Sequence, residues 1–460
     1  MNENIIVIEK NLSNVQTSIQ KKIELLKEYP NSSLFETQKG FQDIDGKTSN
    51  LMIGLLLEIK LVNNNWEFFS VGAFQKYIED CKNIMNENKI GIKEKFRKIL
   101  SILNLPEDYP ITFILGYSAT RFFEDIKNFP INKEEPEIVI RVYQTIIEFD
   151  YTSENKAKIR YLDIKEFEKD IENIIILLKS QPKESLEKNW SMGNIKNITD
   201  KNTFLKCVEI AKSHINSGDI YQVQLSRLAK SNSQIPPLKL FENLTEINPS
   251  PYMYYIDLGE SKIISSSPEL MIRITGDKAQ VRPIAGTKLK NNKNKNLSEI
   301  KKEQAEHLML VDLCRNDLAR CSKSNSLNVP SFMKEEDYGS LIHLVSTIEN
   351  TIDEKFDIFD TLSFNYPAGT MTGAPKIRAI EIINKLEKSN PRGLFSGCAG
   401  YISKNNTGTF ALTIRTIIGN QGNYSLQAAA GIVSDSDPYA EWEETGNKIK
   451  SFSKAFGGYL

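Results

Sequence analysis

The stretch Glu441-Trp442-Glu443-Glu444-Thr445-Gly446-Asn447-Lys448, close to the end of the chain, guides the interpretation of the whole sequence. It follows Asp437-Pro438, a pair typical of the N-cap and first position of a helix. On that helix Glu441, Glu444 and Lys448 share one face, because residues three and four apart are neighbours on a helix surface. Taken alone, the pattern also fits a solvated face with one ion pair worth a few tenths of a kcal/mol.

A second stretch, Lys302-Glu303-Gln304-Ala305-Glu306-His307, repeats this spacing of carboxylates at the start of another predicted helix. If the two helices met, the four carboxylates would repel one another and raise each other's pKa. A hard divalent cation removes such repulsion, and Mg²⁺ commonly takes one or two protein carboxylates together with substrate oxygens and waters. The two stretches therefore predict a magnesium site that an anionic substrate completes.

Composition limits the classes of function. The 460 residues are 40% hydrophobic with a formal net charge of −1, enough for a large core in two or three structural units. A near-neutral chain without a basic stripe argues against a nucleic-acid partner, and no apolar run is long enough to span a membrane. The N-terminus lacks the pattern of a signal peptide, and the five cysteines are scattered, so we expect reduced thiols and a cytoplasmic location.

Periodicity and turn signals predict the organisation of the chain. Apolar positions at helical spacing predict helices over 11–29 and 73–105, and residues 112–120 are β-rich. A polar, broken stretch at 180–199 is the predicted linker, which separates residues 1–185 from residues 200–460. After it come strands in succession, including a long strand over 408–418, and helices between long strands. This order favours an α+β fold with large antiparallel sheets over a doubly wound fold.

Ordered sequence blocks from Gly218 onward carry a family resemblance. They are Gly218-Asp219-Ile220-Tyr221-Gln222-Val223, Asn248-Pro249-Ser250-Pro251-Tyr252-Met253, Ser266-Ser267-Pro268-Glu269, Pro283-Ile284-Ala285-Gly286-Thr287, Ala305-Glu306-His307-Leu308-Met309-Leu310-Val311-Asp312-Leu313, His343-Leu344-Val345-Ser346, Pro367-Ala368-Gly369-Thr370, Gly373-Ala374-Pro375-Lys376 and the 441–448 stretch. Together they resemble the chorismate-utilising enzymes, most of all the large subunits (component I) of anthranilate synthases. The resemblance implies a β-sandwich core of large antiparallel sheets flanked by helices. It also implies a chorismate-binding catalytic region at 200–460 and a regulatory, partner-contacting region at 1–185.

The resemblance further implies Mg²⁺, with Glu306 and Glu444 as its ligands. Glu441 would tune the metal from beside these ligands, and Glu303, counted with the catalytic residues, would do the same. Chorismate is a dicarboxylate, and the resemblance implies that its carboxylates are held by Lys448, Arg415 and the backbone N–H groups around Gly286, Thr287, Ala429, Ala430 and Gly431. It places Phe395 among the substrate-binding residues as well.

The implied catalytic residues are Glu269, His343 and Thr287. Glu269 would protonate the departing C4 hydroxyl, which requires a carboxyl kept neutral by a shielded environment. His343 and Thr287 would assist the loss of pyruvate. Without the resemblance, His343 is better interpreted as a satisfied histidine at a strand edge.

Two positions discriminate within the family. Members that add water carry lysine where this chain has Gln222, and members that make aminodeoxychorismate carry a nucleophilic lysine where it has Ala285. The resemblance therefore implies ammonia addition and pyruvate loss, giving anthranilate for tryptophan biosynthesis, with ammonia supplied by a glutamine amidotransferase subunit (component II) or free in solution. Aminodeoxychorismate or aminodeoxyisochorismate synthesis, and a non-catalytic regulatory chorismate-binding subunit, stay open. Departures from the family pattern are Phe395 for tyrosine, Ala429 for glycine and Lys288 for arginine.

A feedback site is a separate expectation. Leu34-Phe35-Glu36-Thr37 and Pro251-Tyr252-Met253 resemble the two segments that bind tryptophan as an inhibitor, so Glu36, Thr37, Pro251, Tyr252 and Met253 are the predicted effector-binding residues. The alternative is a structural pair of strands without an effector.

Overall fold

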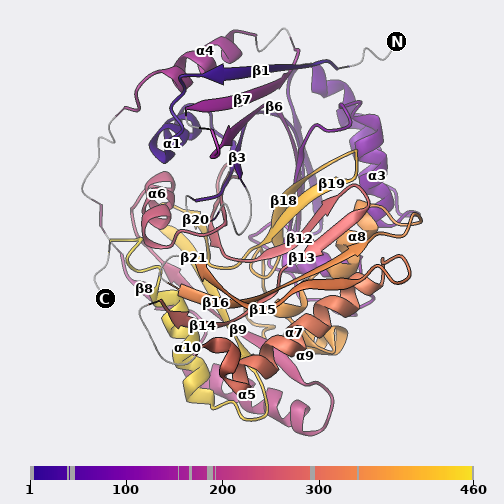
Figure 1. The fold of residues 1–460 in the computed structure, drawn as a ribbon, viewed down its shortest axis with the longest axis vertical. Coiled ribbons are helices and arrows are strands. Elements are labelled where there is room, and N and C mark those ends of the chain that lie inside the picture. The colour runs from indigo at the N-terminus through magenta and orange to yellow at the C-terminus, as the bar shows by residue number, and fades with distance from the viewer. Residues whose placement is uncertain are drawn as a thin grey trace.

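The computed structural model describes residues 5–38, 41, 47–153, 155–164, 168–183, 190–191, 193–290, 296–338 and 341–457 (Figure 1). The strands are β1 (Val7–Ser13), β2 (Ser33–Glu36), β3 (Thr48–Val62), β4 (Asn65–Ser70), β5 (Ile111–Leu115), β6 (Ile138–Asp150), β7 (Lys156–Leu162), β8 (Ile195–Asn197), β9 (Gln222–Ser231), β10 (Tyr252–Asp257), β11 (Lys262–Ser267), β12 (Leu270–Thr275), β13 (Lys278–Val281), β14 (Ile284–Leu289), β15 (Asn328–Tyr338), β16 (Leu341–Thr351), β17 (Gly373–Ala374), β18 (Cys398–Ser403), β19 (Thr407–Leu412), β20 (Thr416–Asn420) and β21 (Asn423–Ile432). The helices are α1 (Ile19–Glu28), α2 (Ile78–Asn86), α3 (Ile92–Ile102), α4 (Glu168–Lys179), α5 (Lys201–Asn216), α6 (Pro237–Ile247), α7 (Lys301–Ala319), α8 (Ile358–Asn365), α9 (Lys376–Leu386) and α10 (Pro438–Lys450), with short 3-10 helices η1 (Gly72–Tyr77), η2 (Tyr117–Phe122), η4 (Leu297–Glu299) and η5 (Gly369–Met371).

The strands form one hydrogen-bonded network with two arms that separate at the β3–β6 pair. The first arm runs β3–β2–β10–β11–β20–β21–β9. The second arm runs β6–β5–β18–β19–β12–β13–β16. All these pairings are antiparallel, so the predicted α+β fold with large antiparallel sheets is confirmed.

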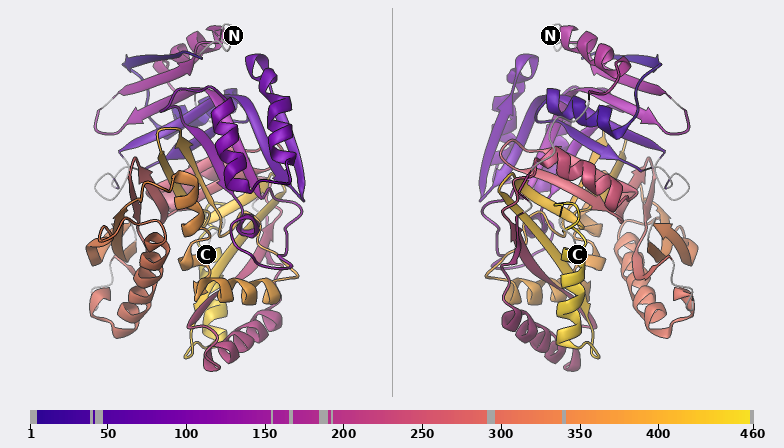
Figure 2. Two further views of the ribbon diagram at one scale, coloured as in Figure 1. Left: turned by 90° about the vertical axis from the view of Figure 1, so that its right-hand side faces the viewer. Right: turned by 90° about the vertical axis from the view of Figure 1, so that its left-hand side faces the viewer.

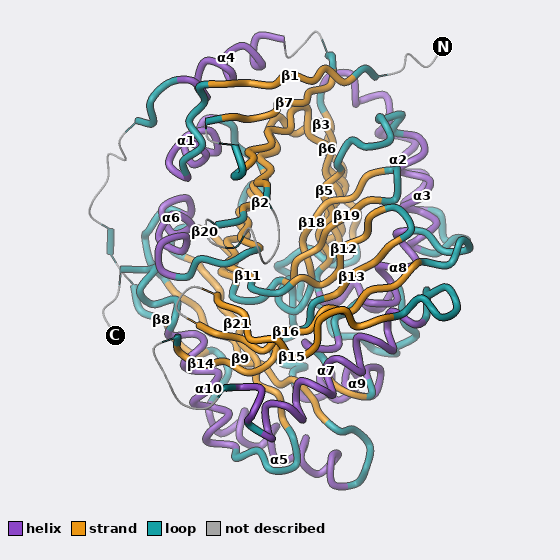
Figure 3. The backbone as a smooth tube through the Cα atoms, viewed as in Figure 1, coloured by secondary structure: helices purple, strands orange, loops and turns teal. Residues whose placement is uncertain are grey.

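The two arms pack face to face. One hydrophobic cluster joins side chains of β10, β11 and β20 to side chains of β5, β18 and β19. Helices α1 and α6 cover the first arm, while α2, α3 and α8 cover the second, and α4 lies beside β1 and β7 (Figure 3). The result is a β-sandwich core between two layers of helices, as the resemblance implied.

The far ends of the two arms carry the helices with the paired carboxylates. Helix α10 packs on β21 at the end of the first arm, and α7 packs on β14 and β16 at the end of the second. Figure 2 shows both helices at the same end of the molecule, away from the N-terminal strands. Residues far apart in sequence are thereby brought to one region.

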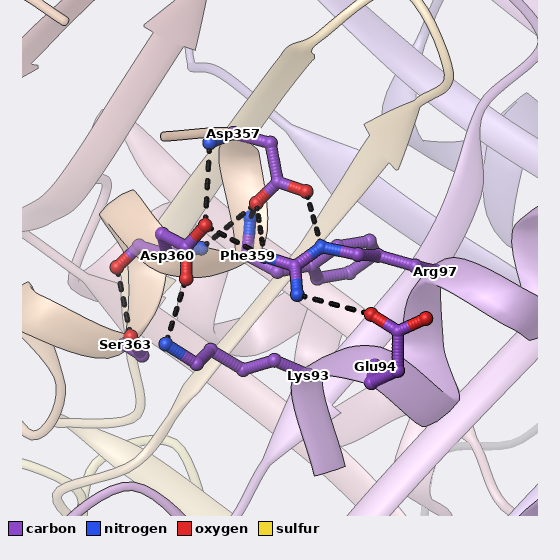
Figure 4. A network of polar contacts seen from close by, with 7 residues as sticks. All are labelled: Lys93, Glu94, Arg97, Asp357, Phe359, Asp360 and Ser363. Atoms are coloured by element: carbon purple, nitrogen blue, oxygen red, sulfur yellow. Dashed lines mark hydrogen bonds and ion pairs between the residues drawn. The ribbon is translucent and has the colours of Figure 1, made fainter. Parts of the chain in front are cut away.

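An ion-pair network fixes α8 against α3 (Figure 4). Asp357 and Asp360 form a capping box at the start of α8. Arg97 of α3 binds both of them, with Nε 2.6 Å from Asp357 Oδ2 and Nη2 2.6 Å from Asp360 Oδ2, and Lys93 Nζ lies 2.7 Å from Asp360 Oδ1. The N-terminal half thus holds the helix that leads to the loop beside Glu269.

Three predicted elements were wrong in their extent. Residues 11–29 do not form one helix: β1 continues to Ser13, Asn14 adopts φ 59°, and Ser18 caps a helix that begins only at residue 19. The region 112–120 changes from strand β5 to the 3-10 helix η2 after Leu115. The strand predicted over 408–418 is broken, because Arg415 adopts φ 48°, a left-handed conformation that a continuous strand excludes.

The predicted boundary between the two regions is not tested by the structure, and three elements were missing from the prediction. Strands from both predicted regions share hydrogen-bonded ladders, for example β2 with β10, and the boundary between the regions stays a prediction. Elements α6, β15 and α8 were not predicted at all. Among the described helices, none is long and apolar enough to cross a membrane.

Candidate active site

Helix α10 begins as its sequence predicts. Asp437 Oδ1 accepts a hydrogen bond from the Ala440 backbone N–H at 2.8 Å, and Pro438 occupies the first turn. Lys448 Nζ lies 2.8 Å from Glu444 Oε1 and donates to the Ala429 carbonyl at 2.7 Å. This lysine joins the carboxylate face of the helix to strand β21.

The carboxylates of α7 and α10 do converge. Burial raises the pKa of Glu306, and the negative charges of Glu303 and Glu444 raise it further. Burial and the charge of Glu444 likewise raise the pKa of Glu441, whose Oε1 accepts a hydrogen bond from Ser436 Oγ at 2.7 Å. The repulsion that the two sequence stretches predicted is therefore present across the two helices.

Glu303 packs directly against strand β14. A Cβ atom on Gly286 would lie 2.7 Å from Glu303 Oε2, so a larger residue here would force the carboxylate to move. Gly286 also has φ 64°, a conformation that favours glycine. The glycine and the carboxylate thus form one wall of the site.

The carboxylate set fits Mg²⁺ only in combination with other ligands. Within the described ranges, no group of three or more His, Cys, Asp and Glu side chains is arranged to hold a metal ion. Mg²⁺ needs no such group, since it often uses one or two carboxylates and takes its other oxygens from substrate and water. Because Glu306 and Glu444 repel each other, a cation between them would lower the energy of both ionised forms.

Glu269 is a buried carboxyl at the junction of β11 and β12. Burial raises its pKa to about 8, while the neighbouring Thr370 hydroxyl and Arg415 guanidinium act in the opposite direction. At neutral pH most molecules therefore carry a protonated Glu269. A protonated carboxyl can act as a general acid.

Arg415 brings a positive charge to the same place. It sits in the left-handed turn between β19 and β20, where its carbonyl accepts a hydrogen bond from the Ser266 N–H at 3.1 Å. Burial lowers the pKa of its guanidinium, and Glu269 and Tyr338 oppose this shift. In the part of the chain that is described, the guanidinium forms no ion pair, so its fork is available for a carboxylate.

His343 of β16 is neutral at physiological pH. Burial lowers its pKa to about 4, and the nearby Arg415 charge adds to this shift. Its Nδ1 lies 2.9 Å from the Gly286 carbonyl, which assigns the proton to Nδ1 and leaves Nε2 as the basic nitrogen. Thr287 lies opposite His343 in the β14–β16 ladder, but its side chain is outside the described residues.

Strand β21 offers two backbone donors beside Lys448. Two residues of the neighbouring strand β9 do not direct their backbone N–H groups at β21. The Ser226 N–H donates to the Glu387 carboxylate, and the Gln224 N–H donates to the Thr372 carbonyl. By the alternation of an antiparallel ladder, Ala429 and Gly431, which pair with these residues, direct their N–H groups away from β9. Ala430, between them, faces β9, so its N–H is not presented on the same side.

Comparison with known proteins decides the family. The family model described as chorismate binding enzyme matches residues 56–454. This chain belongs to the chorismate-binding enzymes. The family resemblance seen in the sequence blocks is therefore confirmed.

Three members of this family show the range of similarity. Anthranilate synthase component 1 of Aquifex aeolicus is 42% identical over 277 residues, which are 59% of this chain and 56% of that protein. Aminodeoxychorismate synthase component 1 of Bacillus subtilis is 34% identical over 356 residues, 74% of each chain. The crystal structure of anthranilate synthase component I from Streptococcus pneumoniae superposes with a TM-score of 0.73 and 29% identity, covering 89% of this chain and 93% of that one. The chain matches little more than half the length of the Aquifex protein.

The structure gives the surroundings of the four positions at which the sequence resemblance distinguishes family members or departs from the family pattern. Gln222 is buried against Gly431, where a Cβ would lie 2.3 Å from its Nε2, and that Nε2 has no partner among the described residues. Ala285 is buried in β14. Phe395 is buried in a large hydrophobic cluster that also contains Ala429, and the Arg392 guanidinium lies 5.6 Å from its ring centre. Lys288 Nζ is 2.8 Å from Glu335 Oε2.

The predicted effector residues also meet. Met253 of β10 lies opposite Glu36 of β2, and Thr37 Oγ1 donates to the Pro251 carbonyl at 3.1 Å. Tyr252 continues β10 next to Met253. Glu36 is buried and is bound by three side chains: Lys22 Nζ at 2.7 Å, Ser49 Oγ at 2.7 Å and the Tyr151 hydroxyl.

Sequence reasoning missed several residues of the catalytic region. Tyr338 packs edge-to-face on His343 with ring centres 5.1 Å apart, and it belongs to the unpredicted strand β15. Lys302, whose positive charge opposes the rise in the pKa of Glu306, lies within the quoted stretch but was given no role. Thr370, next to Glu269, lies in the Pro367–Thr370 block. Its membership of that block was the only sign in the sequence that it could belong to the catalytic region.

Proposed function

We propose that this protein converts chorismate and ammonia into anthranilate and pyruvate, as the synthase component (component I) of an anthranilate synthase. The observation that carries the proposal is the combination of a protonated acid and a neutral base beside one half-buried arginine. Burial raises the pKa of Glu269 to about 8 and lowers that of His343 to about 4, and Arg415 is close enough to affect both. Such opposite shifts in one site are typical of acid–base catalysis.

The positive groups suit a dicarboxylate substrate. Arg415 would bind one carboxylate through its planar fork. Lys448 and the N–H groups of Ala429 and Gly431 would hold the other. When bound by Glu306 and Glu444, with Glu303 and Glu441 beside them, Mg²⁺ would supply a positive charge for the ring carboxylate.

The residues divide between two steps. In the first, ammonia bonds to C2 while the C4 hydroxyl leaves as water with a proton from Glu269, and the new C2 ammonium group then returns one proton to the ionised Glu269. In the second, His343 Nε2 accepts the C2 proton as the ring–oxygen bond breaks. The enolpyruvyl fragment gains a proton and becomes pyruvate, and the ring becomes aromatic. Shielded, fixed groups of this kind contribute roughly 10²–10⁴-fold each to such proton transfers.

Gln222 and Ala285 favour this reaction over others in the family. An amide at 222 cannot act as the base that activates water, and a methyl group at 285 cannot act as a nucleophile. Ammonia would come from a glutamine amidotransferase partner (component II) or from solution. Tryptophan would inhibit the enzyme at the β2–β10 site.

Aminodeoxychorismate synthesis is the second candidate, because the Bacillus subtilis relative that carries this name matches 74% of the chain. Product analysis separates the candidates. Purified protein is incubated with chorismate, Mg²⁺ and ammonium near pH 8, where ammonia is available and Glu269 is still partly protonated. Anthranilate with equimolar pyruvate supports the proposal, while an amino-chorismate without pyruvate supports the second candidate. Chorismate binding without any turnover, unchanged in Glu269→Gln, would indicate a regulatory subunit.

A further inference from the structure

A small cavity of about 20 Å³ lies behind Glu269. Its walls come from the start of β12, the end of β13, helices α7 and α8, and the 368–370 loop. Figure 1 shows α7, α8, β12 and β13 gathered on one side of the molecule. The space exceeds the roughly 10–15 Å³ that one water molecule requires by this measure.

Two uncharged polar atoms of the wall residues form no hydrogen bond of normal distance and angle with a described residue: Thr370 Oγ1, which nevertheless lies close enough to Glu269 to lower its pKa, and Asn365 Oδ1. Both side chains are more than nine-tenths buried. The Asn365 amide cannot simply turn round, because its Nδ2 donates to the Thr361 carbonyl at 2.8 Å. A buried polar atom without a partner costs about 1–3 kcal/mol, so a ligand that satisfies both atoms is strongly favoured.

Two charged wall residues are held in ion pairs. Asp317 Oδ2 of α7 lies 2.6 Å from Lys376 Nζ of α9, and Arg282 Nη2 lies 2.6 Å from Glu336 Oε2. The remaining ionisable wall group is Cys314, and burial raises the pKa of its thiol well above the usual value. It is therefore uncharged, and Glu269 is the ionisable group left to bind a molecule in the cavity.

The position of Asn365 is fixed from outside the site. It is the last residue of α8, whose first turn is held by Arg97 and Lys93 of α3. Thr370 follows within five residues, in η5. Helix α8 thus places the acceptor Asn365, and η5 places the donor Thr370, in the wall of the same small cavity beside Glu269.

We propose that this cavity holds one ordered water that accepts a hydrogen bond from the Thr370 hydroxyl and donates one to Asn365 Oδ1 and one to the carbonyl oxygen of Glu269, so that the Glu269 O–H stays directed at the substrate. Thr370 and Asn365 are then positioning residues, which keep the carboxyl of Glu269 in one orientation through the water. The role of that orientation in catalysis rests on the proposed function of Glu269 as the general acid. The water site itself does not depend on that function.

The first test is a high-resolution crystal structure of the full chain. The expected result is density for a water within hydrogen-bond distance of Glu269, Thr370 Oγ1 and Asn365 Oδ1. An empty cavity, or a direct hydrogen bond between Thr370 and Asn365, would overturn the proposal.

The second test uses infrared difference spectra of the protonated carboxyl, with Glu269→Gln as the reference. Thr370→Val keeps the shape of the side chain but removes its hydroxyl, so the water is lost and the carboxyl stretch moves to higher wavenumber. Thr370→Ser keeps the hydroxyl and should retain the wild-type band. Thr361→Val is the matched control, because Thr361 Oγ1 is also buried without a partner in the described residues but does not line the cavity. An unchanged band in Thr370→Val would refute the water.

Measurement of kcat distinguishes the presence of the water from its role in positioning Glu269. Loss of orientation in Thr370→Val should lower kcat roughly tenfold, less than removal of the acid itself, because misplaced groups retain part of their effect. Thr370→Ser and Thr361→Val should stay close to wild type. If the wild-type protein makes no anthranilate but the density and the band shift are found, the proposed function fails and the water site stands. Equal kcat in Thr370→Val and wild type would refute the positioning role.

Discussion

Two buried glutamates, Glu36 and Glu269, lie in contrasting surroundings. Glu36, in the predicted effector region, is bound by Lys22, Ser49 and Tyr151. Glu269, in the catalytic region, forms no ion pair with any described residue, and burial raises its pKa to about 8. The two side chains are buried to a similar extent, so the difference between them lies in their partners. A buried carboxyl with a full set of partners serves structure, and one that lacks them keeps a proton that it can transfer.

The largest expected effect comes from Glu269→Gln. It removes the transferable proton, so kcat should fall roughly 10²–10⁴-fold. Stability should change little, because no ion pair is broken. Steady-state kinetics and urea unfolding measure the two quantities, and a loss of kcat below tenfold would contradict the role of the acid.

The same carboxyl predicts a pH dependence of the wild-type enzyme. Because its pKa is raised to about 8, the acid form dominates below pH 8 and is lost as the pH rises through that value. At a constant concentration of free ammonia, kcat should therefore fall on the alkaline side of about pH 8. A profile that is flat up to pH 10 would show that Glu269 does not donate the proton.

Lys22→Met tests whether the ion pair with Lys22 stabilises the buried Glu36. It leaves Glu36 buried without its cation, and breaking a buried pair costs about 3–5 kcal/mol of unfolding free energy. Lys82→Met is the matched control, because the Lys82–Glu79 pair is exposed and contributes only about 0–1 kcal/mol. The double variant Lys22→Met/Glu36→Gln should regain part of the loss. If Lys22→Met costs no more than Lys82→Met in urea unfolding, Glu36 does not depend on this partner.

Thr37→Phe tests whether the β2–β10 region also binds tryptophan. The Thr37 hydroxyl bridges β2 to the loop before β10, and a phenyl ring would fill the space beside it. We expect tryptophan inhibition to be lost while activity without tryptophan is retained, with Thr37→Ser behaving as wild type. Inhibition curves that coincide for Thr37→Phe and the wild type would remove the site assignment.

Phe395→Tyr should have the smallest effect. It restores the hydroxyl that the family pattern places there, at a side chain buried under Arg392. A regained hydrogen bond to a substrate carboxylate would lower the KM for chorismate by up to about tenfold, with kcat unchanged. A higher KM would show instead that the hydrophobic cluster around Phe395 has no room for a hydroxyl.

Local signals explain what the sequence predicted correctly. The Asp437-Pro438 pair defines the start of α10, and the spacing of Glu441, Glu444 and Lys448 defines its polar face. These features depend on neighbours within one or two helical turns. The alternating strands likewise predicted the fold class, because the period of a strand is written into a few consecutive residues.

Long-range contacts explain what the sequence could not predict. Arg415 breaks a run that has strand composition, and its left-handed turn is held by the Ser266 N–H from another strand. The partners of Glu36 come from positions 14 and 115 residues away, so no local pattern announces them. The cavity behind Glu269 is likewise invisible in the sequence, since its walls come from five separate segments.

The central claim is that the carboxylates of α7 and α10 form a metal site that becomes complete only when the substrate binds. The most direct test of this claim is the coupling between the binding of Mg²⁺ and the binding of chorismate. Turnover in Glu269→Gln should be slow, and leaving out ammonia prevents the proposed reaction, so calorimetry can measure the Kd of Mg²⁺ with and without saturating chorismate. We predict that chorismate lowers this Kd by at least about tenfold, within the usual range of coupling between sites, and that Glu306→Gln in the same background abolishes the coupling. A Kd for Mg²⁺ that is the same with and without chorismate would contradict a site that the substrate completes.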